Sequence, residues 1–249
     1  MRNKIAIVTG GSRGIGAATA RLAAERGYAV CVNYRANRAA AEAVVGEIEG
    51  AGGRAIAVGA DVGTESDVLR LFETVDRNFG PLTALVNNAG ILERQARLEE
   101  IDAARLARVF AANVTGSFLC AREAVRRMST RHGGAGGAIV NVSSRAAVLG
   151  SPREYIDYAA SKAALDTLTV GLAKEVGDEG IRVNAVRPGF IYTEIHASGG
   201  EPDRIERVKG LAPMRRGGQA LEVARAILWL LSDEASFTTG AFVDVSGGL

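Results

Sequence analysis

Short apolar runs alternate with longer amphipathic stretches along the whole chain. Seven runs of four or five residues have the length and composition of buried strands: Ile5–Thr9, Ala29–Asn33, Ala55–Gly59, Ala84–Asn87, Ala138–Val142, Arg182–Val186 and Phe242–Val245. Between them, six stretches have helical character: Ile15–Arg26, Ala39–Ala51, Ser66–Asn78, Ala103–Met128, Tyr158–Val176 and Leu221–Leu231. This alternation predicts one α/β domain over residues 1–249, with a doubly wound parallel sheet of about seven strands and helices on both faces.

One segment, residues 191–218, interrupts the alternation between the sixth and seventh predicted strands. It is rich in Gly, Pro, Arg and Glu. It follows the carboxyl end of a predicted parallel strand, where binding residues are often carried on loops. We therefore expect a lid over a substrate site, although a disordered surface loop has a similar composition.

The composition argues against several classes of function. The formal net charge is +2 and no long Lys/Arg run occurs, so neither nucleic acid nor a membrane surface is an expected partner. The N-terminus leads directly into the first predicted strand, which predicts a cytoplasmic protein without a signal peptide or membrane span. Cys31 and Cys120 are isolated and expected to be buried and reduced, and with only two histidines no metal site is expected.

A glycine-rich turn directly follows the first predicted strand. Gly10, Gly14 and Gly16 form a G-x-x-x-G-x-G pattern that opens the first helix. Glycines allow the backbone to turn tightly and approach a pyrophosphate, and the helix N-terminus presents unpaired N–H groups. A P-loop is excluded because Ala17-Ala18 stands where a lysine and a Ser/Thr are required. The turn therefore predicts a dinucleotide site on a Rossmann-type sheet.

Tyr158 and Lys162 lie four residues apart within a predicted helix. This spacing places both side chains on one helix face. Because a nearby cation favours the phenolate, we expect Lys162 to lower the pKa of Tyr158 from its usual value of about 10. Tyr158 would then serve as a general acid or base near neutral pH.

Over essentially its whole length the chain resembles the short-chain dehydrogenase/reductase family, in particular bacterial ketoacyl carrier-protein reductases and glucose dehydrogenases. The motifs that carry this resemblance are Thr9–Gly16, Asp61-Val62, Asn87-Asn88-Ala89-Gly90, Asn113, Ser143-Ser144, Tyr158–Lys162, Pro188-Gly189 and Gly247-Gly248. The resemblance implies an oxidoreductase that interconverts a carbonyl and a secondary alcohol of a small molecule by hydride transfer.

By this resemblance, Tyr158 exchanges a proton with the substrate oxygen, while Lys162 lowers the pKa of Tyr158 and binds the nicotinamide ribose. Ser144 is implied to hydrogen-bond the same oxygen, and Asn113 to support a water-linked proton relay. The assignment fits the chemistry, because hydride addition to a carbonyl creates an alkoxide that needs a proton and a hydrogen-bond donor. The alternative, a catalytically silent NADP-binding regulatory or scaffold protein, would not need all four groups.

Two of these assignments have a rival in the sequence. Thirteen residues separate Ser144 from Tyr158, about one more than the commonest spacing in the family, so Ser143 remains a candidate for the catalytic hydroxyl. Tyr155 is a weaker rival to Tyr158, because Pro152 is expected to keep Tyr155 in the loop ahead of the helix.

The choice of cofactor is predicted from charge. An NAD-specific sheet of this type carries an acid at the end of its second strand, where this chain has Asn33-Tyr34-Arg35. Arg13 and Arg35 offer two guanidiniums to a 2′-phosphate, so NADP(H) is predicted in preference to NAD(H). Two solvated surface arginines are the alternative. The expected cofactor-binding residues are Gly10, Ser12, Arg13, Gly14, Ile15, Gly16, Tyr34, Arg35, Asp61, Val62, Asn88, Ala89, Gly90, Tyr158, Lys162, Pro188, Gly189, Ile191 and Thr193.

Within that set, the resemblance places Asp61 at the adenine, residues 87–90 beside the adenine ribose, and Ile191 and Thr193 at the nicotinamide carboxamide. Six polar residues are candidates for the substrate pocket and suggest a hydroxylated or an anionic substrate: Glu93, Arg94, Arg145, Tyr155, Tyr192 and His196.

The resemblance also implies a homo-oligomer, most simply a homotetramer. The helices predicted over Ala103–Met128 and Tyr158–Val176 would form its main interface, because both have long apolar faces. Further contacts are expected near the last strand.

Overall fold

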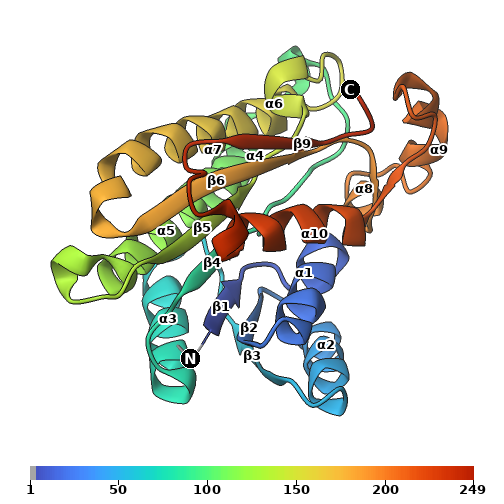
Figure 1. Cartoon of the computed structure of the whole chain (residues 1–249). Helices are drawn as coiled ribbons and strands as arrows, with labels where there is room; N and C mark the ends of the chain where they lie inside the picture. Colours follow the sequence, from blue (N-terminus) through green and yellow to red (C-terminus); the bar gives the residue numbers. More distant parts are fainter. Residues whose placement is uncertain (1–3) are drawn as a thin grey trace.

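The computed structural model describes residues 4–249, so the first three residues of the predicted domain lie outside the described residues. Within this range, seven parallel strands form one sheet in the order β3-β2-β1-β4-β5-β6-β9 (Figure 1). The strands are β1 Lys4–Val8, β2 Tyr28–Tyr34, β3 Arg54–Gly59, β4 Ala84–Asn87, β5 Gly137–Val142, β6 Ile181–Pro188 and β9 Phe242–Val245. The predicted doubly wound parallel sheet is therefore confirmed.

Helices cover both faces of this sheet. They are α1 Gly14–Glu25, α2 Arg38–Gly50, α3 Glu65–Phe79, α4 Ala103–Phe110, α5 Gly116–Met128, α6 Ala146–Leu149, α7 Ile156–Glu175, α8 Ile195–Ser198, α9 Arg204–Val208 and α10 Ala220–Leu231. Successive strand side chains point to opposite faces. In β1, Ala6 and Val8 belong to the core under α1, α2 and α10, whereas Ile5 and Ile7 belong to the core under α3, α5 and α7. With both faces buried, the strands are continuous apolar runs, which made them recognisable in the sequence.

The strand order reverses at β1, which pairs with β2 on one side and with β4 on the other. In open parallel sheets, ligands bind at the carboxyl ends of the strands beside such a reversal. The turns that follow β1 and β4 meet there, since the amide of Thr9 donates to the carbonyl of Val86 at 3.1 Å. This junction positions the candidate site.

The long helix predicted over Ala103–Met128 is not continuous. Between α4 and α5, residues Ala111–Thr115 form a π-helical turn. Such turns widen the helical hydrogen-bond ladder by one residue and are frequent at functional sites. Here the turn carries Asn113 into the interior, where it is fully buried.

The segment 191–218 is more regular than its composition suggests. Besides α8 and α9, it contains β7 Ile191–Tyr192, which pairs in parallel with β8 Gly218–Gln219. In Figure 1, α8 and α9 lie at one end of the molecule near the start of α10. Buried Ile205 and Val208 anchor the segment. Elements of two to five residues are too short for hydrophobic periodicity to reveal them.

Candidate functional site

A cavity of about 430 Å³ lies at the carboxyl ends of the strands and collects residues from all the predicted motifs except Asn113 and Gly247-Gly248. The predicted site residues that line it are Gly10, Ser12, Arg13, Gly14, Ile15, Tyr34, Arg35, Asp61, Val62, Asn88, Ala89, Gly90, Ser144, Tyr158, Lys162, Pro188, Gly189, Ile191 and Thr193. Gly16 and Asn113 lie behind its wall. The sequence therefore identified the motifs that surround one space.

The glycine turn has the geometry that a pyrophosphate requires. Gly10 and Gly14 adopt positive φ angles of 61° and 53°. A Cβ on Gly16 would lie 2.4 Å from the carbonyl oxygen of Gly10, so a larger residue there would push the turn away from the helix. The helix α1 begins at Gly14 with no side-chain cap and no acid in its first turn. Its first N–H groups and positive dipole end therefore suit an anion, and these residues fit a dinucleotide.

Asn88 and Thr9 hold this turn together, a role that the sequence did not reveal. The Asn88 amide donates to the carbonyls of Thr9 at 2.8 Å and Gly10 at 3.1 Å. The Thr9 hydroxyl donates to Val86 and accepts from the amides of Asn88 and Ala89. These bonds tie the turn after β1 to the turn after β4, so Asn88 positions the backbone rather than presenting a free side chain.

The prediction that Asn87 lines the adenine ribose is wrong. Its amide is buried and donates to Asn141 Oδ1 at 3.0 Å and to the carbonyl of Ser117 at 3.1 Å. Asn87 is the last residue of β4, and strand alternation turns its side chain to the α5 face of the sheet, away from the cavity.

The Asn113 side chain also forms hydrogen bonds with the backbone, at Ile91 in the loop after β4. Its Oδ1 accepts from the amide of Ile91 at 2.7 Å, and its Nδ2 donates to the carbonyl of Ile91 and to Ser161 Oγ. A Cβ on Gly90 would lie 3.3 Å from Asn113 Oδ1 and 3.4 Å from Lys162 Nζ. Asn113 therefore braces the loop after β4 directly behind Lys162.

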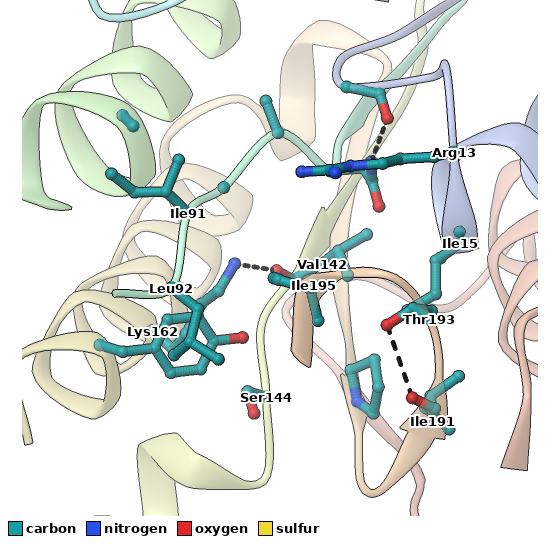
Figure 2. A pocket seen from close by; sticks show the side chains of 18 of the residues that line it. Arg13, Ile15, Ile91, Leu92, Val142, Ser144, Lys162, Ile191, Thr193 and Ile195 are labelled. Carbon is teal, nitrogen blue, oxygen red and sulfur yellow. Dashed lines mark hydrogen bonds between the residues drawn. The ribbon is translucent and has the colours of Figure 1, made fainter. Parts of the chain in front are cut away.

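Tyr158 and Lys162 share one face of α7, as their spacing predicts. The Lys162 ammonium lies 5.6 Å from the centre of the Tyr158 ring and donates to the carbonyl of Val142 at 2.8 Å. Figure 2 shows this bond and places Ser144 on the neighbouring loop. Burial lowers the pKa of Lys162 to about 8, although Asp166 opposes the shift. Phenol, ammonium and Ser144 thus line one wall.

The expected lowering of the Tyr158 pKa is wrong for this structure. Burial raises the pKa of Tyr158 to about 12, while the Ser144 hydroxyl and the Arg204 charge pull it down by smaller amounts. Removing a phenolate from water is costly, and that cost exceeds the stabilisation from its neighbours. At neutral pH the phenol keeps its proton.

The geometry favours Ser144 over Ser143. Ser143 is 2% exposed, and its hydroxyl donates to the carbonyl of Lys162 at 3.1 Å. The Ser144 hydroxyl accepts from the amide of Ala146 at 3.1 Å and is close enough to the Tyr158 phenol to lower its pKa. Tyr155 stands just before α7, as Pro152 predicts, and it is the Tyr158 ring that lies near the Lys162 ammonium.

At the other end of the cavity, Arg13 and Arg35 are both exposed and line its wall. The Arg13 side chain extends across this end in Figure 2. Tyr34 packs its ring against Gly59 at the end of β3. The Asp61 carboxylate accepts from the amide of Gly63 at 2.9 Å, which closes its own turn while leaving the residue at the wall.

The six candidate substrate residues divide into three groups. Arg145, Tyr155 and His196 line the cavity. Glu93 lines a neighbouring cavity, where it forms a bidentate pair with Arg108 at 2.8 and 2.9 Å. Arg94 and Tyr192 are exposed and line neither cavity, and the Tyr192 hydroxyl donates to Glu206 at 2.7 Å.

The sequence did not identify Arg204 or Phe190 as cavity residues. Arg204 stands at the start of α9 and is 9% exposed, and its guanidinium lies over the rings of Tyr155 and Phe190. In the sequence Arg204 is one of many arginines in a charged segment, so no local signal distinguishes it.

Residues 4–249 contain neither a candidate metal site nor a helix suited to span a membrane. No three His, Cys, Asp or Glu side chains in this range gather as metal ligands would. None of the described helices is both long enough and apolar enough to cross a bilayer. Cys31 and Cys120 are buried free thiols, as expected.

The parallel sheet, its glycine turn and the cavity at the strand ends define a Rossmann-type fold with a site that fits a dinucleotide. Residues 10–249 match the family described as enoyl-(acyl carrier protein) reductase. An uncharacterized oxidoreductase of Escherichia coli K12, YgfF, is 62% identical over 98% of this chain and 99% of its own. Cis-4-hydroxycyclohexanecarboxylate dehydrogenase of Sinomonas cyclohexanicum is 42% identical, and the match covers 98% of this chain and 96% of that protein.

Solved structures agree with these relatives. A short-chain dehydrogenase from Burkholderia cenocepacia, in complex with NADP, superposes with a TM-score of 0.90. It is 34% identical, and the match covers 98% of this chain and 97% of that one. The chain therefore belongs to the short-chain dehydrogenase/reductase family, as its motifs indicated.

Proposed function

We propose that the protein is an NADP(H)-dependent oxidoreductase that interconverts a carbonyl and a secondary alcohol of a small molecule, with Tyr158 as the general acid and base. One observation carries this proposal. The uncapped N-terminus of α1 lines the same cavity as the side chains of Ser144, Tyr158 and Lys162. NADP(H), when bound there, supplies or accepts the hydride.

The protein's own groups handle the proton and the charge. With a pKa of about 12, Tyr158 holds a proton at neutral pH and can give it to the substrate oxygen during reduction. The Ser144 hydroxyl donates a hydrogen bond to that oxygen, and the Lys162 ammonium favours the phenolate left behind. Asn113 supports a water-linked proton relay by fixing the loop that flanks Lys162.

Titration with NADPH, followed by a broad panel of carbonyls and alcohols, tests the proposal. Saturable NADPH binding together with turnover of at least one substrate supports it. Tight binding without turnover across the panel would instead favour the silent NADP-binding regulatory or scaffold protein.

Arg35→Ala is expected to weaken NADP(H) binding by about 1.5–3 kcal/mol, the range for a hydrogen bond to a charged group. NAD(H) binding should barely change, because it lacks the 2′-phosphate. The measurement is the ratio of kcat/KM for the two cofactors. Arg77→Ala is the matched control, because Arg77 is an exposed arginine in the last turn of α3 and does not line the cavity. A wild-type preference for NAD(H) that Arg35→Ala leaves unchanged would refute the 2′-phosphate assignment.

We also propose a homotetramer built through the helices α4, α5 and α7. Leu106, Phe110 and Phe118 on α4 and α5 are 39%, 38% and 47% exposed, which is unusual for such large apolar side chains. Light scattering at micromolar concentration should give a tetramer, and Phe118→Arg should shift it to smaller species. Leu211→Arg is the control, because Leu211 is an exposed leucine after α9, outside these helices. A monomeric wild type would contradict the assembly.

A further inference from the structure

Unpartnered polar atoms are concentrated among the residues that line the cavity. Among residues 4–249, six buried side-chain N or O atoms have no hydrogen-bond partner, and four of them belong to residues that line this cavity. These four are Arg145 Nε, Tyr155 Oη, His196 Nδ1 and Arg204 Nη1. Burial raises the pKa of the Tyr155 phenol, although the Gln95 side chain is near enough to Tyr155 Oη to oppose that shift. A buried polar atom without a partner costs about 1–3 kcal/mol, so such a cluster calls for an explanation.

Tyr155 and Arg204 lie near Tyr158, and the Arg204 charge also reaches His196. Tyr155 immediately precedes α7, and the Arg204 charge is near enough to lower the pKa of the Tyr158 phenol. The Arg204 guanidinium lies 5.1 Å from the centre of the Tyr155 ring. A molecule whose oxygen is held at Tyr158 would therefore extend toward these atoms.

His196 presents a hydrogen-bond acceptor. Its Nε2 lies 3.0 Å from the carbonyl oxygen of Ile191, and a carbonyl can only accept, so Nε2 carries the proton. Burial, with a further contribution from Arg204, holds the pKa of His196 below its usual value, although the Ile191 hydrogen bond opposes the shift. The ring is neutral at pH 7, and Nδ1 offers a lone pair that needs a donor.

Arg204 presents a donor whose charge is already balanced. Its Nη2 pairs with Glu154 at 2.6 Å, while Nη1 has no hydrogen bond and its nearest carboxylate, on Glu201, is 3.8 Å away. Arg207 also pairs with both glutamates. The group of Arg204, Arg207, Glu154 and Glu201 thus contains two positive and two negative charges, and it leaves no net charge for an anion.

We infer that the substrate carries at least one hydroxyl group besides the reacting oxygen, and that Tyr155, His196 and Arg204 bind it. A hydroxyl both donates and accepts, so it can satisfy the acceptor on His196 and the donor on Arg204. The Tyr155 hydroxyl can take either role. This inference rests on the proposed oxidoreductase function, and it chooses the hydroxylated over the anionic substrate that the sequence left open.

A carboxylate would match this cluster poorly. It only accepts, so it could bond His196 Nδ1 only if the buried ring took up a second proton, which burial and the Arg204 charge oppose. The buried carboxylate would also meet a charge group that is neutral overall, and its desolvation would not be repaid. The cavity therefore discriminates between the two classes by hydrogen-bond type as well as by charge.

The test compares cyclohexanone with the 2-, 3- and 4-hydroxycyclohexanones and with the 3- and 4-oxocyclohexanecarboxylates, using NADPH. At least one hydroxyketone should exceed cyclohexanone in kcat/KM by roughly 10-fold or more, the factor for one hydrogen bond, and should exceed both carboxylates. Equal values for cyclohexanone and every hydroxyketone, or a preference for a carboxylate, would overturn the inference.

Two variants change single polar groups. Tyr155→Phe keeps the ring beneath Arg204 and removes its hydroxyl, and His196→Gln keeps an N–H near the position of Nε2 but moves the acceptor away from the position of Nδ1. Each should lower the ratio of hydroxyketone to cyclohexanone kcat/KM by roughly 5- to 10-fold. Tyr192→Phe is the matched control, because that hydroxyl bonds Glu206 outside the cavity. An unchanged ratio in both test variants would refute the assignment of these residues.

A measurement of ketone binding distinguishes failure of this inference from failure of the proposed oxidoreductase function. If none of the ketones is turned over, calorimetry with the NADP-loaded protein measures their dissociation constants directly. Tighter binding of a hydroxyketone than of cyclohexanone and the carboxylates would then support the inference while the proposed function fails. Equal or weaker binding would overturn the inference by itself.

Discussion

Replacing Tyr158 with phenylalanine is expected to lower kcat by roughly 10²–10⁴-fold while leaving NADPH affinity nearly unchanged. The change removes the only atom that the proposed mechanism uses for proton transfer, and it keeps the ring that packs beside Lys162. Steady-state kinetics gives the loss in kcat, and NADPH titration of the same preparation shows whether the cofactor site is intact.

Tyr155→Phe is the comparison for this experiment. Tyr155 is buried and lines the same cavity, but it stands ahead of α7, whereas the Lys162 ammonium lies near the Tyr158 ring. Tyr158→Phe should lower kcat for every substrate, whereas Tyr155→Phe is expected to change the preference among substrates. Near-wild-type kcat in Tyr158→Phe, with a large loss in Tyr155→Phe, would identify Tyr155 as the proton donor instead.

Asp157→Ala is expected to lower the free energy of unfolding by about 3–5 kcal/mol, the cost of breaking a buried ion pair by removing one partner. Asp157 accepts from Arg105 Nε at 2.7 Å and from Nη2 at 3.0 Å, and the two side chains are 2% and 10% exposed. The pair joins α4 to the first turn of α7, directly beside Tyr158. Urea unfolding at a fixed protein concentration measures the change.

An exposed pair provides the control for that measurement. Arg38 and Glu42 form an i,i+4 pair on α2 with side chains 76% and 53% exposed, and Glu42→Ala should cost only a few tenths of a kcal/mol. In the double variant with Arg105→Met and Asp157→Leu, much of the lost stability should return, because no unpaired charge remains buried. A loss below about 1 kcal/mol in Asp157→Ala would show that Arg105 finds other partners.

The elements that the sequence predicted correctly are those that depend on local patterns. All seven strands of the main sheet were found because both faces of a parallel sheet are buried and each strand is an apolar run. The long helices were found from periodicity, with ends that moved by a few residues. The placement of Tyr158 and Lys162 on one face of α7 follows from helix geometry alone.

The predictions that failed depend on contacts between distant segments. Asn87 was assigned by its neighbours in the motif, but strand alternation turns it toward Asn141, more than fifty residues away in sequence. The shift of the Tyr158 pKa depends on how deeply the surrounding chain buries the phenol, and no residue spacing reports that depth. The π-helical turn at Asn113 likewise breaks a stretch whose pattern is purely helical.

By itself, the sequence determined the sheet, the glycine turn and the residue types that surround the cavity, because each arises from interactions within a few residues of chain. Only the tertiary structure decided how those residues are used. Asn88 holds the glycine turn because the loops after β1 and β4 meet. Arg204 lines the cavity because the start of α9 lies against Tyr155. Hydrogen bonding, burial and charge balance in the cavity are set by side chains brought together from segments that lie far apart in the sequence, so no local pattern records them.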